Sequence, residues 1–273
     1  MMQEVASQSC TRAQDRKLRV AAHAARVNRM TPRFSMAFQP IVNVATATTY
    51  AFEALVRSAD GEGADTVLSR VPRRNLHMFD LACRSRAMVE AIRCNLLESP
   101  TAARLCVNVN PNAAVERASN LRLTCDEAME LGFPLDRLIL ELVEGDDIAD
   151  FEGLMSVLDE YRGDGVLVAM DDFGAGYSGL KLLSRLKPDV VKLDMSLISQ
   201  IAVDRTSAVI VRTMVQACYE LEIMAVAEGV ETYDIAMRLR DMGVMYQQGN
   251  YFARPAFEAL PRVDCRLPEA MVR

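Results

Sequence analysis

The chain has 273 residues, of which 51% are hydrophobic and 25% charged, with a formal net charge of −6 at pH 7. This composition is typical of a globular protein whose core is large enough to need no disulfides, and the acidic balance argues against a general DNA- or RNA-binding protein. Only two histidines occur, His23 and His77, so H-E-x-x-H zinc sites are excluded and a Ser-His-Asp triad is disfavoured.

The spacing of the cysteines and the length of the apolar runs indicate the cellular compartment of the protein. Seven cysteines occur, none in C-x-x-C spacing, which indicates neither a zinc knuckle nor a disulfide framework. Free thiols are typical of a reducing compartment. No apolar run has the length of a membrane span, and residues 1–30 lack the apolar core of a signal peptide. We therefore expect a cytoplasmic protein without a transmembrane segment.

The N-terminal residues 1–34 are basic. Residues 10–30 are rich in Ala and Arg and contain neither Gly nor Pro, which predicts a helix that Pro32 would end. Residues 1–30 hold six Lys or Arg against two acidic residues. We interpret this segment as a solvated helix or loose arm, with contact to a regulatory partner or a membrane as the alternative.

The next elements predict a hairpin followed by a helix. Residues 36–42 and 48–57 read as strands, and their short connector favours a hairpin. Residues 58–66 are predicted to form a loop. Residues 75–97 read as a long helix, because apolar residues recur there with helical spacing.

From residue 104 onward, strand-like apolar runs alternate with helical patterns. The strand-like runs are 104–109, 138–143, 166–170, 189–193, 223–227 and 244–247. The helical patterns are 125–131, 152–162, 178–185, 205–221 and 232–241. This alternation predicts a parallel sheet covered by helices, and six such units after a hairpin fit a (β/α)-barrel variant better than an open sheet. No linker divides residues 35–257, so we expect one domain there and a C-terminal tail at 258–273.

Polar side chains lie in or near the ends of these strands and of the hairpin strand 48–57. They are Glu53, Asn108, Glu141, Glu144, Asp171, Asp172, Lys192, Asp194, Glu228, Glu231 and Gln248. In a parallel barrel such ends converge on one face, where active sites lie. So many carboxylates would repel one another unless some are protonated or cations bind. Oxygen ligands suit Mg²⁺, Mn²⁺ or Ca²⁺.

The adjacent Asp171 and Asp172 suggest two metal ions a few ångströms apart, as in phosphoester hydrolysis. Lys192 would then orient or help deprotonate a metal-bound water, or stabilise developing charge; a structural ion pair with Asp194 or a neighbouring carboxylate is the alternative. The residues alone leave open another barrel enzyme, such as a Schiff-base aldolase using Lys192, and a non-catalytic binding protein.

Two short motifs point elsewhere. Residues 174–179 match the dinucleotide-binding pattern G-x-G-x-x-G, but Asp171 and Asp172 directly precede it and would repel a pyrophosphate. Asp172-Phe-Gly matches a kinase triplet, but no His-Arg-Asp loop accompanies it. We interpret residues 173–179 as a Gly-rich loop over the site.

Taken in order, seven motifs over about residues 35–257 resemble the EAL domain family, which hydrolyses the bacterial second messenger cyclic di-GMP. They are Phe38-Gln-Pro-Ile-Val42 with Glu53-Ala-Leu55, Asn108-Val-Asn-Pro111, Glu141-Leu-Val-Glu144, Asp171-Asp-Phe-Gly-Ala-Gly-Tyr-Ser178, Val191-Lys-Leu-Asp194, Val226-Ala-Glu-Gly-Val-Glu231 and Gln248-Gly-Asn-Tyr-Phe-Ala-Arg-Pro255. Val143, Ala175, Gly179, Asn43 and Asn110 depart from the residues usual in this family, but none is an expected metal ligand.

The resemblance implies an α/β fold, a (β/α)8 TIM-barrel variant whose first strand runs antiparallel to the rest. It implies a cyclic-guanylate phosphodiesterase with two Mg²⁺ or Mn²⁺ ions, linear pGpG as product, inhibition by Ca²⁺ and a homodimer. The alternative is a weak or inactive domain that acts as a cyclic di-GMP receptor or a protein-interaction module.

The resemblance also implies a role for each site residue. The expected metal ligands are Glu53, Asn108, Glu141, Asp171, Asp172 and Glu228. The expected catalytic residues are Lys192, Glu53 and Glu228, and the expected substrate contacts are Arg57, Gln39 and Asp194. Glu144, Glu231 and Gln248 are expected to support the site, with Glu144 anchoring the loop 173–179.

Overall fold

The computed structural model describes residues 33–109, 117–143, 148, 150–176 and 179–263. The predicted N-terminal helix at 10–30 lies outside the described residues, as do Glu144 and the tail beyond residue 263. Among the described helices, none combines the length and apolar character needed to cross a bilayer.

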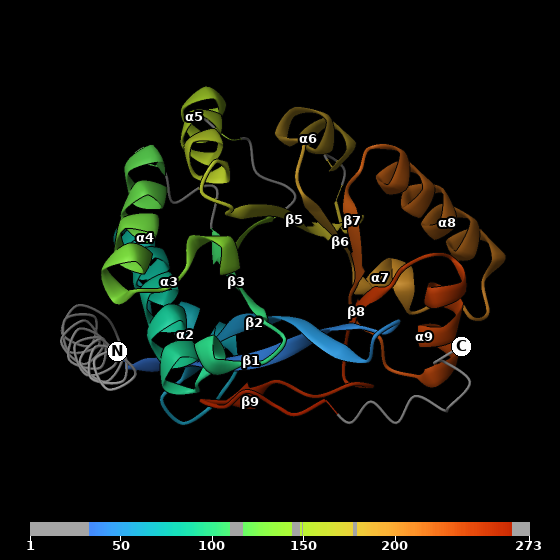
Figure 1. Cartoon of the computed structure of the whole chain (residues 1–273), viewed down its shortest axis with the longest axis horizontal. Coiled ribbons are helices and arrows are strands. Elements are labelled where there is room, and N and C mark those ends of the chain that lie inside the picture. Colours follow the sequence, from blue (N-terminus) through green and yellow to red (C-terminus); the bar gives the residue numbers. More distant parts are fainter. Residues whose placement is uncertain (1–32, 110–116, 144–147, 149, 177–178, 264–273) are drawn as a thin grey trace, which may run out of the picture.

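Eight strands of the described chain close into a barrel (Figure 1). They are β1 (Phe34–Asn43), β2 (Thr48–Ser58), β3 (Arg104–Val109), β4 (Leu138–Val143), β5 (Leu167–Phe173), β6 (Val190–Leu193), β7 (Met224–Ala227) and β8 (Tyr246–Gln248). Neighbouring strands from β2 to β8 are parallel, whereas β1 pairs antiparallel with both β2 and β8. The expected TIM-barrel variant with an antiparallel first strand is confirmed.

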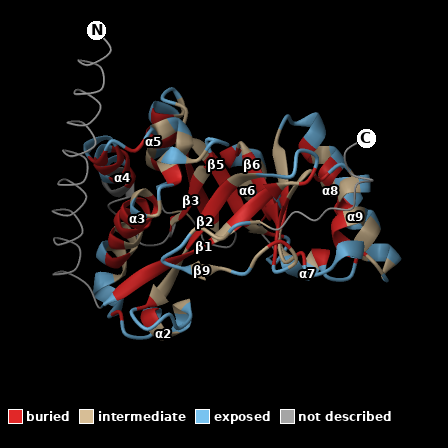
Figure 2. Cartoon of the chain, turned by 60° about the horizontal axis from the view of Figure 1, so that its bottom comes forward, coloured by how far each residue is buried: buried red, intermediate tan, exposed pale blue. Residues whose placement is uncertain are grey.

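Helices surround this barrel, and their outer faces carry much of the exposed surface, as Figure 2 shows for α8 and α9. They are α2 (Ala64–Leu68), α3 (Leu76–Arg93), α4 (Arg117–Leu131), α5 (Phe151–Arg162), α6 (Gly179–Leu186), α7 (Met195–Ile198), α8 (Arg205–Glu220) and α9 (Tyr233–Asp241). A short strand, β9 (Ala256–Phe257), pairs with β1 on the outside of the closed ring.

The structure departs from the sequence prediction mainly in short elements. The predicted loop at 58–66 contains the beginning of α2, a five-residue helix too short to show a helical period. α4 begins at Arg117, before the predicted 125, and α3 ends at Arg93 because Asn95 adopts a left-handed conformation with φ of +61°. Neither α7 nor β9 was predicted, because elements this short carry little pattern.

The core has two parts. The larger part lies between the barrel and its helices and includes Leu140, Val168, Val191 and Leu239. The smaller part, called here the apolar layer, lies inside the barrel and consists of Ile41, Ala51, Cys106, Ile139, Ala169, Val190 and Val226. All seven of its side chains are buried, so the barrel interior beneath the site is filled with apolar atoms.

Candidate active site

The charged and amide side chains of the site lie directly above the apolar layer. Successive residues of a strand point to opposite faces, so residues two apart share a face. Glu53, Asn108, Glu141, Asp171, Lys192 and Glu228 each follow a member of the apolar layer by two positions. In the antiparallel β1, Gln39 precedes Ile41 by two. Because of this alternation, the side chains come together at the carboxyl end of the barrel.

Lys192 stands at the centre of this group. Its Nζ lies 2.7 Å from Glu228 Oε1, 2.9 Å from Asp171 Oδ1, 3.1 Å from Glu141 Oε1 and 3.3 Å from Glu53 Oε2. The Lys192 side chain is 1% exposed and that of Glu141 0%. A single ammonium group thus faces four carboxylates, three from β2, β4 and β5 and one directly after β7, in a space that water hardly reaches.

Amide groups hold one of these carboxylates in place. Gln248 Nε2 donates to Glu53 Oε2 at 2.7 Å and to Gln39 Oε1 at 3.2 Å. Asn108 Nδ2 donates to Glu53 Oε1 at 3.5 Å, and Gln39 Nε2 donates to the Ala253 carbonyl at 3.1 Å. Glu53 is therefore oriented from two sides. Gln39 is fixed between β8 and the segment that follows it.

Asp171 and Asp172 reach the site through an irregularity in β5. The register between β5 and β6 shifts between Met170 and Phe173, and Asp172 has a φ of +54°. Aspartate tolerates this left-handed conformation better than most residues do. Because the shift interrupts the usual alternation of faces, two successive carboxylates lie on the same side of the sheet, where a regular strand would separate them.

Burial governs the protonation of these groups. It raises the pKa of Glu141 well above its usual value and that of Glu228 to about 8, although Lys192 lowers both. Burial, together with repulsion from Asp171, also raises the pKa of Asp172. Burial alone would lower the pKa of Lys192, but Asp171, Glu141, Glu228 and Glu53 together raise it well above 10.5. Lys192 is therefore an ammonium donor, and it does not fully neutralise the carboxylates around it.

The donor set fits divalent cations. Two groups of carboxylates, Glu53–Glu141–Asp171 and Asp171–Asp172–Glu228, each place oxygen atoms within 4.8 Å of one another. Asp171 belongs to both groups. Glu141, at the base of the first group, is fully buried and faces the Lys192 ammonium at 3.1 Å. Carboxylate oxygens are the ligands that Mg²⁺ and Mn²⁺ prefer, so these residues match a pair of neighbouring ions.

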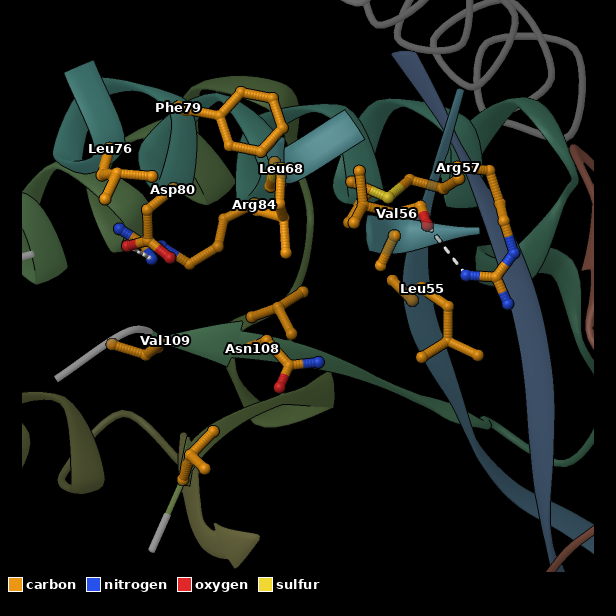
Figure 3. Close-up of a pocket in the computed structure, with 17 residues that line it drawn as sticks. Leu55, Val56, Arg57, Leu68, Leu76, Phe79, Asp80, Arg84, Asn108 and Val109 are labelled. Atoms are coloured by element: carbon orange, nitrogen blue, oxygen red, sulfur yellow. Dashed lines mark hydrogen bonds and ion pairs between the residues drawn. The ribbon is translucent and has the colours of Figure 1, made fainter. Parts of the chain in front are cut away.

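A cavity of about 450 Å³ adjoins this cluster at Asn108. In Figure 3, Phe79 and Leu68 lie on one side of it, with Asn108 and Val109 on the other. Its lining is mostly apolar. Arg57 lies at its edge, and Nη1 of Arg57 donates to the Val56 carbonyl at 2.8 Å. Sequence reasoning missed the apolar residues of this cavity, because they read only as core positions of β2, α2 and α3.

Three expected site residues lie outside the group around Lys192. Asp194 caps α7, since its Oδ1 accepts a hydrogen bond from the Ser196 N–H at 2.9 Å. Glu231 is exposed in the segment between β7 and α9. Arg57 extends from the end of β2 at the edge of the cavity. The remaining expected residues among those described are the ones brought together around Lys192.

Comparisons with known proteins agree on one family. The EAL domain family model matches residues 22–255. A standalone EAL protein of Vibrio cholerae O395, solved with cyclic di-GMP bound, is 38% identical, with a TM-score of 0.77 over 85% of this chain and 95% of that chain. BlrP1 of Klebsiella pneumoniae, solved as a manganese and cyclic di-GMP complex, is 32% identical, with a TM-score of 0.78 over 84% of this chain and 58% of that one.

Curated relatives of Escherichia coli K12 carry two kinds of name. The probable cyclic di-GMP phosphodiesterase PdeD is 29% identical over 81% of this chain. The blue light- and temperature-regulated antirepressor BluF is 26% identical over 83% of this chain. The chain spans 41% of the length of PdeD and 55% of the length of BluF, so both relatives have large parts without a counterpart here.

Proposed function

The chain belongs to the EAL domain family, and we propose that it hydrolyses one phosphodiester bond of cyclic di-GMP to give linear pGpG, with two Mg²⁺ or Mn²⁺ ions. The observation that carries this proposal is the cluster around Lys192, in which two carboxylate groups share Asp171. Bound ions of this kind lower the pKa of water and neutralise the charge of a phosphate.

The side chains of the site have distinct roles in this proposal. Glu53, Asn108, Glu141 and Asp171 hold one ion, and Asp171, Asp172 and Glu228 hold the other. Lys192, charged and buried, donates hydrogen bonds to the attacking water and stabilises the negative charge that develops during attack. Glu228, beside the Lys192 ammonium, shares in orienting that water.

Substrate recognition uses groups around the cluster. Arg57, at the edge of the cavity, contacts a phosphate, and its planar guanidinium suits two phosphate oxygens. The mostly apolar cavity beside Asn108 accepts one guanine base, and Gln39 contacts the other. Asp194 contacts the substrate through the oxygen that does not cap α7, while Gln248, Glu231 and Glu144 support the site.

The alternative is a domain without hydrolytic activity that acts as a cyclic di-GMP receptor or as a protein-interaction module. The name of the relative BluF, an antirepressor, favours the protein-interaction module. The two functions differ in one observable property, which is the formation of product. Retention of the lysine and of all the expected carboxylates favours the enzyme.

A chromatographic assay separates the two functions. Purified protein is incubated with cyclic di-GMP and Mg²⁺ or Mn²⁺, with EDTA and Ca²⁺ as parallel conditions. We expect pGpG to form with Mg²⁺ or Mn²⁺ and not with EDTA or Ca²⁺. We also expect Glu53→Ala to abolish product formation and Glu62→Ala, which alters an exposed glutamate, to leave it unchanged. Tight binding without product in the wild-type protein would favour the receptor.

We also propose a homodimer and a regulatory contact. Leu180 of α6, Val203 before α8 and Ile210 of α8 are large apolar side chains with exposed fractions of 66%, 83% and 42%. A second copy would cover them. Val203→Glu is expected to yield monomers in sedimentation if it does. Deletion of residues 1–32, which leaves Phe34 of β1 in place, tests the regulatory contact, since it is expected to change turnover or oligomeric state.

A further inference from the structure

The single helical turn α7 lies between the two loops that carry site carboxylates. It follows β6 directly and begins at the Asp194 cap. The Asp194 N–H donates to the Phe173 carbonyl at 3.2 Å, next to Asp172. On the other side, the Glu228 N–H donates to the Leu193 carbonyl at 3.1 Å. The backbone thus ties the start of α7 to both loops.

Two side chains of α7 pack closely against glycines of these loops. A Cβ atom at Gly174 would lie 2.3 Å from Leu197 Cδ1, and one at Gly229 would lie 2.2 Å from Met195 Cγ. Both glycines have a positive φ, +101° at Gly174 and +62° at Gly229. Glycine is required at each position for its conformation and for the close approach of the α7 side chain.

The two contacts lie next to the residues that make up one carboxylate group. Gly174 is two residues after Asp172, and Gly229 directly follows Glu228. These carboxylates extend from strand ends or loops, whereas Glu53 and Glu141 of the other group lie within β2 and β4. The contacts of α7 with the two glycines therefore affect the positions of Asp172 and Glu228 more than those of Glu53 and Glu141.

We infer that Met195 and Leu197 are positioning residues, which set the separation of Asp172 and Glu228 and thereby the affinity of the Asp171–Asp172–Glu228 group for a divalent cation. The inference rests on the proposed function only in that a cation occupies this group. Met195 remains 52% exposed, so its truncation removes little buried apolar surface. The side chain acts through its contact with Gly229.

Titration of the full chain with Mn²⁺ alone tests the inference. We expect Met195→Ala and Leu197→Ala each to weaken one of two classes of Mn²⁺ site by about 10-fold or more, as changes to supporting residues commonly do. The other class should stay as in the wild type, and so should the melting temperature of metal-free Met195→Ala, because Met195 is largely exposed. Met129→Ala is the matched control, since Met129 is 53% exposed on α4, away from the site.

A double variant tests the contact itself. Gly174→Ala should weaken the same class of site, because its methyl group meets Leu197. Adding Leu197→Ala removes the atoms that the methyl group meets, so the double variant should bind Mn²⁺ more tightly than Gly174→Ala alone. If the effect of Gly174→Ala came only from backbone strain, the second substitution would restore nothing.

The outcomes separate this inference from the proposed function. Wild-type Mn²⁺ binding without turnover would contradict the phosphodiesterase and leave the α7 result to be judged from binding. Unchanged affinity in both α7 variants, or equal weakening of both classes together with a lower melting temperature, would overturn the positioning role. A wild-type protein that binds no Mn²⁺ would contradict both.

Discussion

Two layers of side chains inside the same barrel, only two residues apart on each strand, have opposite chemistry. The apolar layer pairs with the layer above it as Ala51 with Glu53, Cys106 with Asn108, Ile139 with Glu141, Ala169 with Asp171, Val190 with Lys192 and Val226 with Glu228. The lower layer is filled with carbon atoms and one thiol. The upper layer carries charges that a protein interior disfavours.

The contrast shows how this barrel divides stability from function. The lower layer closes the barrel interior, so water reaches the upper layer only from the face where the strands end. In that dry space an ammonium attracts carboxylates strongly, yet one Lys192 cannot neutralise all of them. We expect substitutions in the upper layer to change chemistry and substitutions in the lower layer to change stability.

The largest effect is expected for Lys192→Met. Loss of the ammonium removes the hydrogen-bond donor for the attacking water, and turnover of cyclic di-GMP should fall by about 10²- to 10⁴-fold. Mn²⁺ binding should become tighter, because the ammonium repels cations. Turnover and Mn²⁺ titration are measured on protein whose fold is checked by circular dichroism.

The matched control for this substitution is Lys181→Met, which removes an exposed lysine of α6. It should leave turnover and Mn²⁺ affinity as in the wild type. Near-normal turnover in Lys192→Met would mean that the upper layer does not perform the chemistry assigned to it.

The second effect concerns the lower layer. Ile139→Ala should lower the free energy of unfolding by about 2–5 kcal/mol, because it leaves a cavity in a filled interior. Turnover per folded molecule should stay near the wild-type value. Urea unfolding and turnover at low temperature measure both quantities. Leu123→Ala, an exposed position on α4, should change stability by less than about 0.5 kcal/mol. A large loss of turnover in folded Ile139→Ala would contradict the claim that the lower layer affects stability and not chemistry.

The third effect is stabilisation by metal. Mn²⁺ at 100 times its dissociation constant should raise the free energy of unfolding by about 2.7 kcal/mol through mass action. The melting temperature should therefore be higher with Mn²⁺ than with EDTA, and Glu141→Gln should remove much of this difference. Equal melting temperatures with Mn²⁺ and with EDTA would show that the upper layer is not a cation site.

The smallest effect concerns a carboxylate outside the barrel. Asp204 caps α8, and hydrogen bonds from the Ser207 and Thr206 N–H groups, at 2.7 and 3.2 Å, lower its pKa. Because the folded-state pKa is the lower one, the cap stabilises the protein fully above the ordinary value of 3.8 and loses this contribution as the pH falls below it.

Asp204→Asn separates the cap from its charge. Asparagine also caps helices well, so we expect little change in melting temperature at neutral pH. The melting temperature of the variant should fall less steeply than that of the wild type as the pH drops below 3.8. Identical acid profiles would contradict the lowered pKa of Asp204.

The barrel and its upper layer were predictable because they depend on strong, regular patterns. Apolar runs such as 104–109 and 138–143 coincide with β3 and β4, since buried parallel strands leave a clear signal. Polar residues that interrupt such runs, as Glu141 and Lys192 do, indicate the face on which they converge.

What the sequence did not reveal depends on single backbone conformations and on packing. The shift at Asp172, which extends β5 to Phe173 beyond the predicted end at residue 170, requires a φ that no periodicity indicates. The turn α7 is too short for a helical pattern, so the contact between Leu197 and Gly174 was invisible. Gly174 and Gly229 were visible in the motifs, but their packing partners were not.

The most direct test of the shared two-ion site is the number of Mn²⁺ ions bound per chain, measured by equilibrium titration of the wild type and of Asp171→Asn. Because Asp171 belongs to both carboxylate groups, we expect two ions on the wild type and weakened binding of both in the variant. Asp159→Asn, at an exposed position on α5, should bind as the wild type does. No binding by the wild type, or unchanged binding by Asp171→Asn, would contradict the shared two-ion site.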